Sequence, residues 1–99
     1  MNDKVTYWVE MSDYDFDTAK AMLETKRYLY VAFMCHQTIE KILKAYWSKV
    51  LEEPPLKIHN LSRLAEKSGL DKDMSEGQTD FIDELEPLNI EARYPSYKE

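Results

Sequence analysis

The stretch HQTIEKILKAYW, residues 36–47, decides the fold of this 99-residue chain. On a helix of 3.6 residues per turn, it places His36 and Glu40 one turn apart in the middle of an otherwise apolar stripe. Glutamate is almost never buried without a partner, and side chains at this spacing lie within reach of one hydrogen bond. The stretch therefore predicts a central helix that carries an ionisable pair in its core.

The composition indicates one helix-rich domain spanning residues 1–99. Apolar residues make up 43% of the chain and charged residues 32%, with only two glycines, which is typical of a soluble globular domain. No apolar run approaches the ~20 residues that cross a bilayer, and no basic-then-apolar leader opens the sequence. A single cysteine, Cys35, provides neither a disulfide framework nor a thiolate metal site, so a reduced cytoplasm is the expected compartment.

The charge pattern disfavours an extended nucleic-acid surface. The formal net charge is -6, whereas affinity for phosphates comes mainly from clustered lysines and arginines. A local basic patch stays open as an alternative to ordinary solvated helix faces. One stretch of chain holds six of the thirteen basic residues, which are Lys41, Lys44, Lys49, Lys57, Arg63 and Lys67.

Four helical segments are predicted, and the first two are long. The first has a single apolar face formed at three- and four-residue steps by Val5, Trp8, Val9, Phe16, Ala19 and Leu23. The second runs from about Tyr28 to Glu52, where two prolines follow and stop it. Its two apolar stripes leave only a narrow polar strip, composed of Gln37, Lys41, Lys44 and Ser48. A helix that is apolar on most sides is predicted to lie at the centre of a bundle or in a subunit interface.

The last two segments are shorter. Asn60 is the predicted N-cap of the third helix, and Gly69 is its left-handed stop. The fourth helix is expected to begin near Thr79 or Asp80 and to be kinked or split by Pro87. Short loops make neighbouring helices antiparallel, so the predicted fold is an all-α, up-and-down four-helix bundle. The residues from 93 to 99 look like a loop that leads into a further helix, as in a longer protein or a shortened family member.

The candidate site is a polar network in the bundle core formed by His36, Glu40 and Arg93. We expect the Arg93 guanidinium to clamp the Glu40 carboxylate. Catalysis by His36 and Glu40 is the weaker interpretation, because no second acid and no nucleophile has a recognisable partner. His36, Glu40 and His59 do not form an HExxH metal motif, and His59 is expected to anchor the third helix through a backbone hydrogen bond. No catalytic residue, metal ion or cofactor is predicted.

Four features in this order resemble the HEPN domain family, in the branch with a C-terminal Arg-Tyr-Pro loop. They are an acidic first helix, the run 37–45 with Glu40 and two lysines, the turn 58–61 around His59, and Arg93-Tyr94-Pro95. The resemblance implies an antiparallel helical bundle that forms homodimers, binds nucleotides and occurs beside a minimal nucleotidyltransferase in toxin–antitoxin pairs. Ribonuclease branches of the family use an arginine, four to six intervening residues and then a histidine. Here eight residues separate Arg27 from His36, and no histidine follows Arg93.

The expected function is that of a non-catalytic binding or regulatory module whose partner is a minimal nucleotidyltransferase. Lys41, Lys44, Arg93 and Tyr94 are the candidate residues for binding a nucleotide or that partner. Two alternatives stay open. One is a metal-independent ribonuclease whose catalytic histidine lies outside these residues. The other is a purely structural interaction protein with no small ligand.

Overall fold

The fold was established from a computed structural model, which describes the backbone of residues 3–93 and the side chains of residues 3–90. The elements are α1 (Asp3–Glu24), α2 (Tyr28–Leu51), α3 (Leu61–Ser68), a short 3-10 helix η1 (Leu70–Asp73) and α4 (Glu76–Arg93). Residues 3–93 contain no strand, so the all-α prediction is confirmed. None of these helices is both long enough and apolar enough to cross a membrane.

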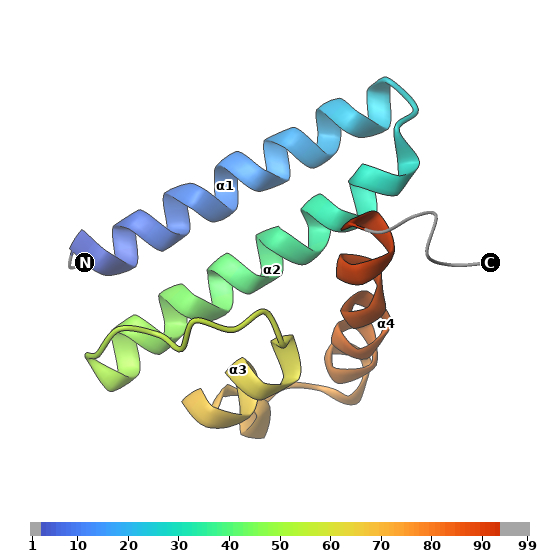
Figure 1. The fold of residues 1–99 in the computed structure, drawn as a ribbon. Helices are drawn as coiled ribbons and strands as arrows, with labels where there is room; N and C mark the ends of the chain where they lie inside the picture. The colour runs from blue at the N-terminus through green and yellow to red at the C-terminus, as the bar shows by residue number, and fades with distance from the viewer. Residues whose placement is uncertain (1–2, 94–99) are drawn as a thin grey trace.

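The long helix α2 is the centre of the molecule (Figure 1). It packs against α1 on one side and against α3 and α4 on the other. α1 and α2 form an antiparallel hairpin, closed by a turn in which Lys26 adopts a left-handed φ of 61°. α4 then returns toward the beginning of α2, which confirms the predicted up-and-down arrangement.

The apolar core lies on the α3–α4 side of α2. Trp47 is 4% exposed, and both Leu61 and Leu64 are fully buried. The complete cluster joins two residues of α2, three of α3 and two of α4, which are Leu43, Trp47, Leu61, Leu64, Ala65, Ile82 and Leu85. Burial of these side chains supplies the main driving force for closing α3 and α4 onto α2.

The interface between α1 and α2 is more polar than the sequence predicts. Ser12 and Asp15 are buried on α1, whereas Phe16 and Leu23, which we predicted to be buried, are 49% and 55% exposed. The hydroxyl of Ser12 donates to the carbonyl oxygen of Thr38 over 2.9 Å, and Asp15 pairs with Lys41 at 2.9 Å. The buried face of α1 is therefore rotated relative to the predicted apolar face, and it includes polar residues whose partners lie on α2.

The predicted ends of the helices are correct for α3 and wrong for α4. The Asn60 side chain accepts a hydrogen bond from the Arg63 backbone, and Gly69 ends α3 with a left-handed φ of 85°. Helix α4 begins at Glu76 rather than near Thr79 or Asp80, because Ser75 and Gln78 exchange two hydrogen bonds that cap it. The helix also continues through Pro87 and is not split there, since Ile82 and Leu85 hold it against α2.

Candidate functional site

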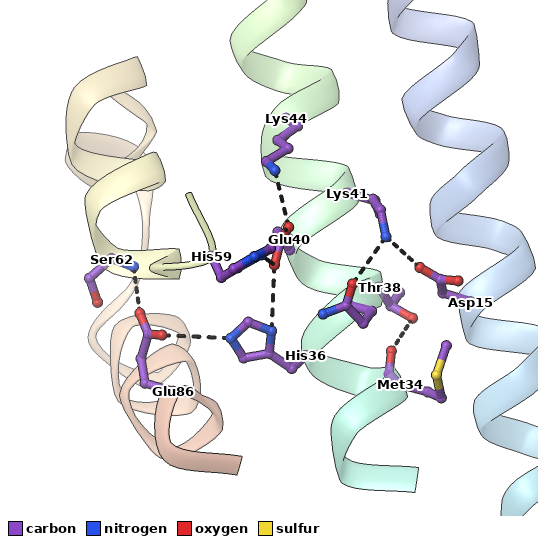
Figure 2. Close-up of polar contacts among 11 residues, drawn as sticks. Asp15, Met34, His36, Thr38, Glu40, Lys41, Lys44, His59, Ser62 and Glu86 are labelled. Carbon is purple, nitrogen blue, oxygen red and sulfur yellow. Dashed lines mark hydrogen bonds and ion pairs between the residues drawn. The ribbon is translucent and has the colours of Figure 1, made fainter. Parts of the chain in front are cut away.

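Glu40 is the centre of a buried charged cluster on α2. Its side chain is 2% exposed, and its carboxylate faces side chains from α2 itself and from the loop before α3 (Figure 2). The Lys44 ammonium, one turn further along α2, donates to Oε2 over 3.1 Å. The Glu40 cluster is defined as Glu40, the three residues that face its carboxylate, and one carboxylate that contacts His36; its members are His36, Glu40, Lys44, His59 and Glu86.

His59 contacts Glu40 with its side chain, so the predicted backbone anchor at the start of α3 is wrong. Its Nδ1 lies 3.1 Å from each oxygen of the carboxylate. His59 immediately precedes Asn60, the N-cap of α3, and its ring stays 56% exposed. The contact therefore ties the loop between α2 and α3 to the middle of α2. One edge of the imidazole is buried against Glu40, and the other part is open to solvent.

His36 lies between two carboxylates and is completely buried. Its Nδ1 is 3.8 Å from Glu40 Oε1, and its Nε2 is 3.6 Å from Glu86 Oε2. Both distances exceed a normal hydrogen bond, and neither ring nitrogen has a hydrogen-bond partner within the described residues. Glu86 has a second contact, in which Oε1 accepts a hydrogen bond from the Ser62 backbone over 3.0 Å. Through Glu86, the cluster connects α4 to the first turn of α3 (Figure 2).

Burial lowers the pKa of the His36 imidazole, because charging the ring without water is unfavourable. The negative charges of Glu40 and Glu86 oppose this shift, and the neighbouring His59 adds to it. With a pKa below the ordinary value of 6.5, His36 is neutral at pH 7. The ion pair at the core is therefore formed by Glu40 and Lys44, and His36 is a polar neighbour of that pair.

This shift predicts that acid destabilises the fold through His36. The unfolded chain protonates His36 near pH 6.5, whereas the folded chain takes up that proton only at lower pH. The unfolded state therefore holds more protons below this pH, and the free energy of unfolding falls as the pH drops, by at most about 1.4 kcal/mol per pH unit for one proton. Urea unfolding of the wild type and His36→Gln between pH 7.5 and 5.5 measures the effect. Parallel curves for the two proteins would contradict it.

The structure places two of the four predicted nucleotide- or partner-binding residues. Lys44 is 7% exposed and paired with Glu40, and its ammonium also lies 5.5 Å from the centre of the Trp8 ring. Lys41 pairs with Asp15 and donates to Gln37 over 3.2 Å. The Arg93 side chain and Tyr94 lie outside the described part of the chain, as does the predicted clamp on Glu40. The binding role of these four residues stays a prediction.

Lys44 and Glu86 are two members of the Glu40 cluster whose positions local sequence patterns indicate only in part. Lys44 follows Glu40 by four residues, a spacing at which an acid and a lysine pair on one helix face. Glu86 follows the buried Ile82 by the same step, which places it at the edge of the buried face of α4. The contacts of His59 and Glu86 cross between elements, so spacing alone does not reveal them.

The cluster can hold charge and polarise an imidazole, but it does not form a metal site. Among the residues whose side chains are described, no group of three or more histidine, cysteine, aspartate or glutamate side chains is arranged to hold a metal ion. A carboxylate that holds one nitrogen of an imidazole is the arrangement that general bases use. None of the three grooves described for this surface is lined by His59 or Glu40. The observed role of these contacts is to join α2 to the α3 loop and to α4.

Comparison with known proteins identifies the family. The profile of the HEPN domain matches residues 5–99, which is nearly the whole chain. No curated protein and no solved structure gives a significant match. The chain belongs to the HEPN domain family, a class of helical modules related to nucleotides and RNA, and its helical fold agrees with that assignment.

Proposed function

We propose that this HEPN domain is a non-catalytic binding module that forms homodimers and pairs with a minimal nucleotidyltransferase. In the toxin–antitoxin systems to which the sequence resemblance points, such a pair is the functional unit. The module presents surfaces for the partner, and its Glu40 cluster holds the helices that form those surfaces. The nucleotide-binding part of our prediction requires Lys41 and Lys44 to release their carboxylates. For this reason the geometry supports the partner-binding role more strongly than the nucleotide-binding role.

One observation carries this proposal, which is the position of the histidines. The sequence has two, and both contact the Glu40 carboxylate. His36 is completely buried, so it is unavailable to an RNA backbone in this conformation. Arg27 precedes the first turn of α2, beside a separate groove near Tyr30 and Phe33. His36 is therefore not placed as the base of a ribonuclease site with Arg27, and this favours the binding role over the ribonuclease alternative.

Apolar side chains at the beginning of α2 support the dimer part of the proposal. Tyr28 is 61% exposed, Tyr30 is 46% exposed and Leu29 is 39% exposed. Tyr30 lines a groove of about 450 Å³ at the α1–α2 end of the molecule, together with Met22, Phe33 and Met34. Several large exposed apolar side chains beside a groove are a feature of surfaces that contact other proteins.

The test is co-expression of the chain with the nucleotidyltransferase encoded beside its gene, followed by purification through a tag on one partner only. Light scattering of the eluted protein should give the mass of a defined complex. A homodimer that never retains the neighbouring protein would reject the partner role and leave the purely structural interpretation. RNA cleavage that persists in chelator would instead support the ribonuclease alternative.

A further inference from the structure

A second feature, separate from the Glu40 cluster, is an apolar groove on the α4 side of the molecule. It has a volume of about 610 Å³ and lies between α2, η1 and the first half of α4. Its apolar lining consists of Ile39, Leu43, Leu70, Met74, Phe81 and Ile82. The groove is large enough to accept several side chains from one face of a helix.

Phe81 is an exposed aromatic side chain in the lining of this groove. Its side chain is 51% exposed although it lines the groove together with buried Leu43 and Ile82. An aromatic ring buries a large apolar area when a partner covers it, so it is a natural anchor for a contact.

The elements on one side of the groove, η1 and the first half of α4, carry an exposed acidic stretch that we call the acidic edge. Every acidic residue between positions 70 and 84 is exposed, and the same stretch has one basic residue, Lys72. The acidic residues are Asp71, Asp73, Glu76, Asp80, Asp83 and Glu84, and of these Asp83 accepts a hydrogen bond from the Ser62 hydroxyl of α3. Asp73 also lines the groove directly, together with the polar Gln78. An occupant with apolar residues on one side and lysines or arginines beside them would match both properties.

We propose that this groove binds a basic amphipathic helix of the partner protein. The partner's apolar residues would cover Phe81 and enter between α2 and α4, with anchors three, four and seven residues apart. Its basic residues would flank them and face the acidic edge. This inference rests on the proposed function, because it assigns the partner's contact to one surface.

A second copy of the chain is a poor occupant for electrostatic reasons. In a two-fold symmetric dimer, the same patch from each subunit meets itself. Two copies of this patch would bring their acidic edges together, and like charges across an interface are unfavourable. The proposed dimer contact at the beginning of α2 therefore leaves this groove for another protein.

The test uses two synthetic helical peptides with the same leucine spacing and about 18 residues each. One has lysines at its polar positions, and the other has glutamates. Fluorescence anisotropy of each labelled peptide is measured against the intact chain at low salt and again at high salt. We expect the lysine peptide to bind at least tenfold more tightly than the glutamate peptide, with an affinity that falls as salt rises.

Two variants separate the groove from general attraction between opposite charges. Phe81→Ser should weaken binding of the lysine peptide about tenfold or more, because it removes the anchor surface. Phe16→Ser is the matched control, since this phenylalanine on α1 is 49% exposed, close to the 51% of Phe81, and lies outside the groove. Circular dichroism of both variants confirms that each is folded.

Three results would overturn the inference. They are equal affinity for the two peptides, equal loss in Phe81→Ser and Phe16→Ser, or a change from dimer to monomer caused by Phe81→Ser alone. The last result would assign the groove to a second copy. Failure of the co-purification with the nucleotidyltransferase is a different outcome. It rejects the proposed partner, whereas the peptide measurement reports on the groove itself.

Discussion

Replacing Glu40 with glutamine is expected to lower the free energy of unfolding by about 3–5 kcal/mol, because it removes one charge of a buried ion pair. Lys44 is 7% exposed as a residue, and its ammonium would stay in the core without its counter-charge. Glutamine has nearly the same shape as glutamate, so the loss reports on the charge and not on a cavity. Urea unfolding at pH 7.5, followed by circular dichroism, measures it.

Glu10→Gln is the matched control for this substitution. Glu10 is exposed on α1, and the same change there should alter the free energy of unfolding by no more than about 0.5 kcal/mol. If Glu40→Gln were as stable as Glu10→Gln, the Glu40 carboxylate would not be compensating a buried charge. The ligand interpretation of the site would then gain support, because a residue kept for ligand binding need not contribute to the stability of the fold.

The Glu40 cluster shows how far sequence patterns reach. His36, Glu40 and Lys44 are successive residues at four-residue steps on one helix, so their proximity follows from helix geometry. The other two members, His59 from the loop before α3 and Glu86 from α4, are distant in sequence and meet α2 only through the tertiary fold. We predicted that a buried Glu40 has a partner, and the structure gives it Lys44 and His59. The assignment of that role to Arg93 lies outside the described side chains, and Lys44 provides an ammonium at 3.1 Å.

The faces of α1 and α2 show a second limit. Periodicity identifies both helices correctly, yet it ranks residues by apolar character and so places Lys44 and Ser48 on a polar strip facing solvent. The structure buries both of them. A polar residue can be buried when its partner is present. For Ser12 and Asp15, which are buried on α1, that partner lies on the opposite helix of the hairpin. That information is absent from either helix taken alone.

Lys44→Ala is expected to lower the free energy of unfolding by about 3–5 kcal/mol, which separates the structural role of this lysine from a nucleotide-binding role. A lysine that serves only a ligand would leave stability nearly unchanged when replaced, and nucleotide affinity would fall. Here the ammonium pairs with Glu40, which is 2% exposed. Removing the ammonium leaves the Glu40 charge buried, and the fully buried His36 beside it is neutral at pH 7. Urea unfolding measures stability, and calorimetric titration with ATP measures binding in the same samples.

Lys49→Ala is the control for that measurement, because Lys49 is exposed near the end of the same helix and its loss should change stability by no more than about 0.5 kcal/mol. A double variant, Glu40→Met with Lys44→Met, adds a decisive comparison. Apolar residues of similar volume in place of a buried ion pair are often neutral or stabilising, so the double variant should recover most of the stability that either single change loses. Such recovery would show that the pair is a matched internal contact. If the double variant instead loses the sum of the two single effects, each residue acts through other partners, and the cluster is not organised around this pair.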